Sequence, residues 1–137
     1  MADYEKPVPT PSPVSAPFWE SAKAHALKVQ RCAPNQHWFF YPRKRCPFCH
    51  AEDIDWVEVS GKGLVYTYTV VYRAADPSFD PDLPYVFAVV ELEESPNLRM
   101  YTNVDDVSLE EIKSGMPVTV KYDDVTDDVT LVKFVPA

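Results

Sequence analysis

Glycine is scarce in this chain, with only three among 137 residues. A glycine-rich phosphate-binding loop is therefore excluded. No run of about 18 apolar residues occurs, which excludes a membrane-spanning helix, and the N-terminal segment lacks the basic-then-apolar pattern of a signal peptide. The three cysteines are an odd number and cannot form a closed disulfide framework, so we expect reduced thiols and a cytoplasmic protein.

Basic residues are also in short supply. The chain has 13 Lys and Arg against 21 Asp and Glu, and the resulting net charge of −8 repels phosphate backbones. We therefore do not expect nucleic acid as a partner. The basic residues that do occur concentrate around the cysteines, at Lys28, Arg31, Arg43, Lys44 and Arg45. Such a patch can meet an anionic ligand such as a phosphorylated cofactor, or it can serve solubility and interface salt bridges.

The cysteines have the spacing of a zinc ribbon in which one position is changed. Two C-x-x-C segments joined by a short hairpin are the usual way to hold a tetrahedral zinc. The second segment is complete, with Cys46 and Cys49, whereas the first has Cys32 but carries Asn35 in place of its second cysteine. Three thiolates are thus available, and the fourth ligand must be of another kind.

Several assignments are open for the fourth ligand. His37 is the first choice, because the short loop before it can turn back and present the imidazole to the ion. His50 directly follows Cys49 and would have difficulty in reaching the same ion. The oxygen of Asn35 or a water molecule could also complete the site, and a ribbon without metal stays open as well.

The metal is expected to be structural rather than catalytic. No carboxylate or spare histidine lies suitably near the cysteines in the sequence to act as a base toward a zinc-bound water. We therefore expect no catalytic residue in this chain. The predicted zinc ligands are Cys32, His37, Cys46 and Cys49.

The chain divides into three predicted parts. Residues 1–16 carry proline at every second position from 7 to 13, which favours an extended arm that is either disordered or laid along a partner. Residues 17–53 hold a short helix, at residues 17–27, and the zinc ribbon. Residues 54–137 form the third part. Ser15 is expected to cap the helix.

The third part reads as a five-stranded barrel. Runs of β-branched and aromatic residues predict strands, and a capping box at Ser108 and Glu111 predicts one helical turn between the third and fourth strands. This order is that of an OB-fold barrel, since a β-sandwich needs about seven strands. The fold class is therefore mainly β, with an N-terminal helix and ribbon. The predicted barrel strands are residues 64–72, 85–92, 98–103, 116–122 and 129–134.

Aromatic residues on the predicted strands allow two interpretations. They can stack on nucleic-acid bases, as in oligonucleotide-binding barrels, although the acidic balance argues against it. Packing in the core explains them equally well. The residues concerned are Tyr66, Tyr68, Tyr72, Phe87 and Tyr101.

The arrangement resembles a bacterial and archaeal family long known as a domain of unknown function, which joins an N-terminal helix, a rubredoxin-like zinc ribbon and an OB fold. The resemblance covers about residues 17–137, and Asn35 departs from it. The motifs that carry it are Phe18-Trp19-Glu20, Gln30-Arg31-Cys32, Tyr41-Pro42-Arg43, Cys46-Pro-x-Cys49, Ser60-Gly61-x-Gly63, Pro84-Tyr85 and Gly115-Met116-Pro117.

The resemblance implies a small, non-catalytic partner subunit of a thiolase-like protein, in a hetero-oligomer that we expect to be a heterotetramer. Such complexes make or break carbon–carbon bonds in acyl-CoA thioesters, for example in the degradation of steroids or of aromatic compounds such as benzylsuccinyl-type CoA esters. The zinc would be structural. The predicted contacts to the phosphates of CoA are Arg31, Arg43, Lys44 and Arg45. A stand-alone acyl-CoA-binding module and a single-strand nucleic-acid binder are the competing hypotheses.

Overall fold

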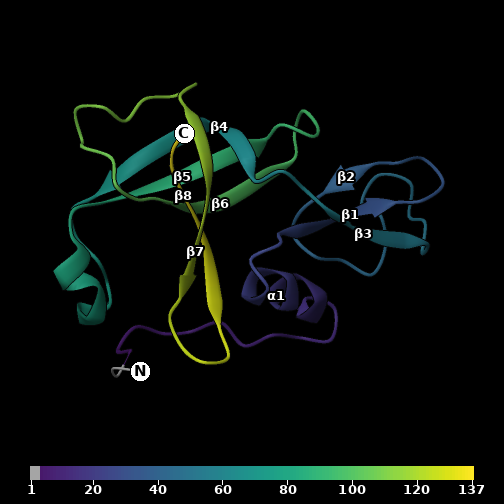
Figure 1. Cartoon of the computed structure of the whole chain (residues 1–137), viewed down its shortest axis with the longest axis horizontal. Coiled ribbons are helices and arrows are strands. Elements are labelled where there is room, and N and C mark those ends of the chain that lie inside the picture. The colour runs from purple at the N-terminus through teal and green to yellow at the C-terminus, as the bar shows by residue number, and fades with distance from the viewer. Residues whose placement is uncertain (1–3) are drawn as a thin grey trace.

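The computed structural model describes residues 4–137 and consists of a β-barrel, a small three-stranded sheet and one α-helix (Figure 1). The small sheet lies at one end of the barrel, and the helix packs at the junction between them. The prediction of a mainly β protein with an N-terminal helix, a ribbon and a five-stranded barrel is confirmed.

The barrel closes in the strand order β4-β5-β6-β8-β7, which is the order of an OB fold. All neighbouring strands are antiparallel except β6 and β8, which pair in parallel through Val104 and Phe134. The side chains alternate, so that one face of each strand fills the barrel, with Phe134 fully buried. The strands are β4 (Lys62–Val71), β5 (Tyr85–Leu92), β6 (Arg99–Val104), β7 (Pro117–Asp124) and β8 (Thr130–Pro136).

Two of the glycines, Gly61 and Gly63, lie at the start of β4, where the chain enters the barrel. Gly63 lies where β4 runs between β5 and β7, and a Cβ atom there would lie 2.5 Å from the carbonyl oxygen of Glu91. Gly61 has a φ angle of +79°, in the region that residues with a side chain rarely adopt. These two constraints account for the Ser60-Gly61-x-Gly63 motif.

The ribbon sheet has the strand order β2-β1-β3, with β1 at Lys28–Cys32, β2 at Trp38–Phe39 and β3 at Ile54–Glu58. The predicted division at residues 53 and 54 assigned the segment of β3 to the barrel. In the structure, β3 pairs with β1 along its whole length, from Ile54 opposite Cys32 to Glu58 opposite Lys28. The ribbon needs this strand because β1 would otherwise have a neighbour on one side only.

Helix α1 spans Ala16–Lys23 and is shorter than predicted. The helix ends early because His25 has a φ of +56°, and the N–H of Ala26 turns back to the carbonyl of Ser21. Ser15 does stand at the N-cap, but the predicted side-chain cap is wrong. Its hydroxyl instead accepts a hydrogen bond from the N–H of Ser12.

The helix and the ribbon share one hydrophobic core with the barrel. Phe18 and Leu27 are almost fully buried and belong to the same cluster as the inward side chains of the barrel strands. Phe18 therefore packs on its own chain. The contact is fixed by Tyr122 of β7, whose hydroxyl accepts a hydrogen bond from the N–H of Leu27 at 2.9 Å.

The N-terminal arm lies against its own barrel. From α1 it crosses the β7–β8 hairpin toward the 3₁₀ helix η1, which spans Pro77–Asp82 between β4 and β5 (Figure 1). Lys6 forms an ion pair with Asp82 at the end of η1. The described part of the arm therefore contacts its own barrel, while residues 1–3 of the predicted arm lie outside the described residues.

The barrel aromatics are on the surface, so their interpretation as core residues is wrong. Tyr101 keeps 77% of its surface exposed, and the other four are exposed as well. Within residues 4–137, no helix combines the length and the apolar character that crossing a lipid bilayer requires.

Candidate metal centre

The metal centre is built from two loops that share one hydrogen-bond pattern. In the first loop, the N–H of Cys32 donates to the carbonyl of His37 and the N–H of Gln36 donates to the carbonyl of Cys32. In the second loop, the N–H of Cys46 donates to the carbonyl of Ala51 and the N–H of His50 donates to the carbonyl of Cys46. Gln36 and His50 both have positive φ angles, of 56° and 63°. The two loops are therefore copies of one turn.

This equivalence shows how the first loop differs from the second. Cys49 occupies the fourth position of its loop, and Asn35 stands at the corresponding position of the first. His37 lies two residues later, directly before β2, and its longer side chain reaches back over the loop. The ligand that Asn35 cannot supply is thus available from the residue that precedes β2.

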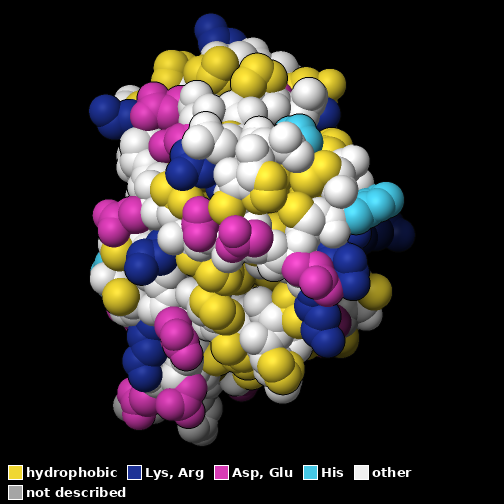
Figure 2. Space-filling view, turned by 90° about the vertical axis from the view of Figure 1, so that its right-hand side faces the viewer, with side chains coloured by type: hydrophobic (Ala, Val, Ile, Leu, Met, Phe, Trp, Pro, Cys, Tyr) yellow, Lys and Arg dark blue, Asp and Glu magenta, His cyan; other side chains and the backbone are white. Residues whose placement is uncertain are grey.

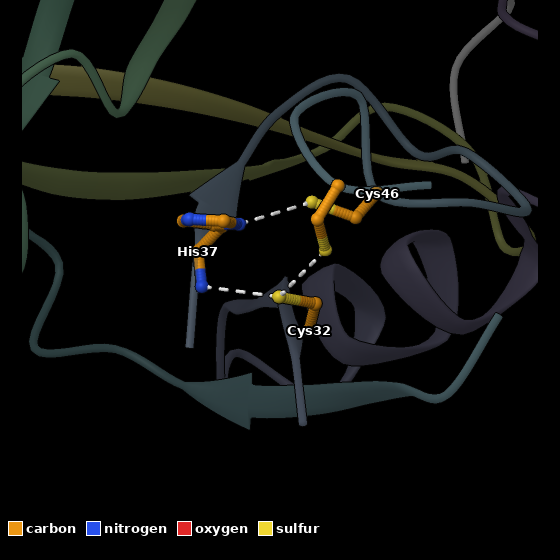
Figure 3. Close-up of side chains that lie close together, drawn as sticks. Cys32, His37 and Cys46 are labelled. Carbon is orange, nitrogen blue, oxygen red and sulfur yellow. Dashed lines mark hydrogen bonds between the residues drawn. The ribbon is translucent and has the colours of Figure 1, made fainter. Parts of the chain in front are cut away.

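The structure brings the four predicted ligands together. Figure 3 labels three of them, Cys32, His37 and Cys46. Their ligand atoms all lie within 4.8 Å of one another. The sulfur of Cys32 lies 3.9 Å from that of Cys49, and the sulfur of Cys46 lies 3.4 Å from Nδ1 of His37. Among residues 4–137, these are the side chains that meet as a metal-binding group.

The donor set fits Zn²⁺. Two thiolates bound tetrahedrally to one zinc, each at about 2.3 Å, lie about 3.8 Å apart, close to the separation of Cys32 and Cys49. Three sulfurs and one imidazole nitrogen also satisfy the coordination number of a structural site and leave no position for a reactive water. When bound, the ion would tie the two loops of the ribbon together.

The surroundings favour the thiolate form at one cysteine. A hydrogen bond from the side chain of Asn35, followed by one from the N–H of Ala51, lowers the pKa of Cys49 to about 6. Burial raises the pKa of the Cys46 thiol. Asn35 therefore acts beside the ligand set, as a donor to a sulfur, a role that the cysteine spacing does not reveal.

Backbone amides support the other two sulfurs. The N–H of His37 points to the sulfur of Cys32 at 3.2 Å, and the N–H of Phe48 points to that of Cys46 at 3.4 Å. The ring of Phe48 also packs edge-on against the imidazole of His37. His50 is exposed and does not belong to the cluster of four.

The four predicted CoA-binding residues have different surroundings. The guanidinium of Arg31 lies over the Trp38 ring, and Arg45 forms an ion pair with Glu52 at 2.6 Å. Lys44 is exposed. Of these four residues, Arg43 alone lines the groove that lies between the ribbon and the barrel.

A closed Cys₃His centre in a three-stranded ribbon, joined to a barrel with OB strand order, defines a zinc-ribbon and OB-fold protein. Residues 19–55 match the family described as "ChsH2, rubredoxin-like zinc ribbon domain", and residues 56–123 match "ChsH2, C-terminal OB-fold domain". The chain belongs to this ChsH2/DUF35 family.

Some curated relatives are similar in length to this chain, and others are much longer. A "DUF35 domain-containing scaffold protein" of Pyrococcus furiosus is 42% identical over 74% of this chain and 72% of its own length. A "Probable enoyl-CoA hydratase alpha subunit" of Thermomonospora curvata is 39% identical over 88% of this chain. A "3-oxo-4,17-pregnadiene-20-carboxyl-CoA hydratase alpha subunit" of Mycobacterium tuberculosis is 32% identical over 87%. This chain spans only 37% of each of the two hydratase subunits.

A solved structure of an "Ltp2-ChsH2(DUF35) aldolase" contains a chain of nearly the same extent. It superposes with a TM-score of 0.83 at 36% identity, and the match covers 94% of this chain and 98% of that one.

Proposed function

We propose that this chain is a non-catalytic subunit of an enzyme complex that acts on acyl-CoA thioesters. The observation that carries the proposal is the match along nearly its whole length to a chain from an Ltp2-ChsH2(DUF35) aldolase structure. A closed metal centre supports a structural role, because four protein ligands leave no coordination position for a substrate.

In the finer form of the proposal, the partner is a thiolase-like subunit. The complex cleaves a carbon–carbon bond, by thiolysis or retro-aldol cleavage, in the degradation of an aromatic or steroid compound. The relatives named as alpha subunits of CoA-ester hydratases support an acyl-CoA substrate, and one of them is named for a steroid-derived CoA ester. We expect a heterotetramer in the cytoplasm, in which this chain stabilises the catalytic subunit.

The proposed metal is structural zinc, bound by Cys32, His37, Cys46 and Cys49. The ribbon has its own small cluster around Phe39, which is too small to hold the two loops by apolar contacts alone. A zinc ion would therefore supply much of the free energy that folds this end of the molecule.

The proposed contact to CoA rests on exposed cationic side chains that are not engaged elsewhere. Arg31 and Arg45 already have partners, whereas Arg43 and Lys44 present exposed cationic side chains. We expect Lys44, which does not line the groove between ribbon and barrel, to contact a phosphate of CoA in the assembled complex.

The proposal is tested by expressing the chain together with its operon neighbours. We expect a stable complex with a thiolase-like protein, and we expect cleavage of an acyl-CoA thioester by that protein to depend on this chain. A chain that remains alone and binds CoA by itself would instead support the stand-alone acyl-CoA-binding module. A partner protein whose activity is the same with and without this chain would contradict the proposed role.

A further inference from the structure

A groove of about 720 Å³ lies between the helix, the ribbon and the outer side of the barrel. Helix α1 and the loop after β2 form one wall, and β4, β6 and β8 form the other. Aromatic side chains dominate the lining: Phe18, Trp19, Phe40, Tyr41, Tyr66 and Tyr101.

The charged residues in the groove all have one sign. Arg43, Arg99 and Lys133 line it, and no Asp or Glu of the described residues does, in a chain that has 21 acidic residues against 13 basic ones. Glu91 pairs with Arg99 at 3.2 Å, and Asp123 pairs with Lys133 at 2.7 Å. Among the ion pairs formed within residues 4–137, none includes Arg43.

The position of Arg43 is fixed by its backbone. Its N–H donates to the side-chain oxygen of Gln30 at 2.7 Å, and its carbonyl accepts from the side-chain nitrogen of Gln30 at 2.8 Å. Gln30 itself is buried. Arg43, which has no carboxylate partner among the described residues, therefore lines an apolar groove from a loop whose backbone Gln30 anchors.

The outer side of the barrel continues this surface. Val89 of β5 is opposite Tyr101 of β6, and Phe87 and Tyr101 share the outer side, with ring centroids 6.2 Å apart. Arg99 lies on the same side, with its guanidinium carbon 3.7 Å from the centre of the Tyr66 ring. We call this surface the aromatic face: Tyr41, Arg43, Tyr66, Phe87, Arg99 and Tyr101.

Figure 2 gives a partial view of the exposed apolar surface from the ribbon side. Hydrophobic side chains reach the surface in a broken band along the molecule, with acidic and basic side chains beside it. Large apolar side chains are exposed both on the ribbon, as at Tyr41, and on the barrel, as at Tyr66 and Tyr101.

We propose that the aromatic face is the surface that docks the catalytic subunit, and that the subunit places carboxylates opposite Arg43 beside apolar side chains. Tyrosine, tryptophan, phenylalanine and arginine are the residues that dominate the centres of protein interfaces, where acidic residues and lysine are depleted. Because Arg43 has no ion-pair partner among the described residues, charge complementarity calls for a carboxylate of the partner at this point. This inference rests on the proposed function, because it names the surface through which the proposed complex assembles.

Single-stranded nucleic acid is the other occupant that aromatic and basic side chains can bind. Binding of this kind requires several cations free to neutralise phosphates. Two of the three cations in the groove are already paired with carboxylates, and the chain as a whole has a net charge of −8. A protein surface is therefore the favoured occupant.

The test measures the affinity of the purified partner subunit for variants of this chain with matched controls. Arg43→Glu and Tyr101→Ser should each weaken binding by about tenfold or more. Lys44→Glu makes the same charge change one residue away, outside the groove, and Tyr72→Ser removes another exposed tyrosine. Both controls should stay within about twofold of the wild type, and all four variants should keep the wild-type circular dichroism spectrum and zinc content.

The outcomes separate the inference from the proposed function. If the wild type binds no enzyme subunit, the proposed function fails. If the wild type binds and all four variants bind equally well, only the aromatic face is refuted. A rise in KM for CoA in Arg43→Glu without loss of association would assign this residue to CoA instead, and salt-dependent binding of an oligonucleotide that Tyr101→Ser abolishes would assign the face to nucleic acid.

Discussion

At the scale of single residues, the metal centre shows how a missing ligand is replaced. Asn35 cannot ligate through sulfur, and its loop has the same backbone pattern as the loop of Cys49. His37 reaches the site from just before β2, while a hydrogen bond from the Asn35 side chain lowers the pKa of Cys49. Donors beside a metal centre orient the ligands and tune their basicity.

A pair of histidine variants tests this assignment. His37→Ala should weaken zinc binding by at least about 100-fold, since changes outside the ligand set alone cost about 10- to 100-fold. His50→Ala, at the position of the second loop that corresponds to Gln36 of the first, should change the affinity by less than about twofold. Competition with a chromogenic chelator measures both.

A rescue variant makes the histidine test more specific. Asn35→Cys in the His37→Ala background restores a four-thiolate ribbon and should recover most of the lost zinc affinity. Equal affinities for His37→Ala and the wild type would contradict the ligand assignment. So would a large loss in His50→Ala.

These residues also show what the sequence can predict at this scale. The spacing of Cys32, Cys46 and Cys49 was sufficient to identify a ribbon, and the proximity of His37 made it the first candidate. The donor role of Asn35 and the stacking of Arg99 on Tyr66 depend on contacts between loops or strands. The spacing of residues along the sequence does not indicate such contacts.

At the scale of elements, the helix and the barrel are joined through β7. The ring of His25, at the end of α1, stacks on Tyr122 with the centroids 4.7 Å apart, and its Nε2 lies 3.0 Å from Asp124. A hydrogen bond from the Thr130 hydroxyl, followed by the one with His25, lowers the pKa of Asp124 below its usual value. The ionised carboxylate therefore stabilises this junction.

The pH dependence of stability tests the junction. Because the pKa of Asp124 is lower in the folded state than in the unfolded state, its stabilising effect is present above about pH 4 and is lost as the pH falls through the folded pKa. Asp124→Asn should be less stable than the wild type at pH 7, and the difference should shrink below about pH 4. Urea unfolding at a series of pH values measures it.

The control for this prediction is Asp127→Asn, in the exposed turn of the same hairpin. It should follow the wild-type pH dependence. A constant difference between Asp124→Asn and the wild type from pH 7 to pH 3 would show that ionisation of Asp124 does not support the junction.

The sequence predicted the barrel strands well because each is a run of β-branched and aromatic residues bounded by turns. It did not place β3, whose residues alternate in the same way as those of a barrel strand. Only its pairing with β1 assigns the segment to the ribbon. The end of α1 was predicted too late because alanine-rich sequence favours helix, whereas the positive φ of His25 is set by its contacts with β7.

At the scale of the whole molecule, the chain combines a closed metal centre, a barrel with a filled interior and an apolar surface outside both. The hydrophobic core runs from α1 and β1 into the barrel, so the ribbon is held in a fixed orientation to the aromatic face. Such a construction suits a rigid docking subunit, because little has to be ordered when a partner binds.

The proposed assembly is tested most directly by co-expressing this chain with its operon neighbours and measuring the mass of the complex by native mass spectrometry. We predict a hetero-oligomer in which copies of this chain and of a thiolase-like subunit are equal in number, with one zinc bound to each copy of this chain. A mass showing this chain alone and without zinc, in the presence of a folded thiolase-like neighbour, would contradict the account.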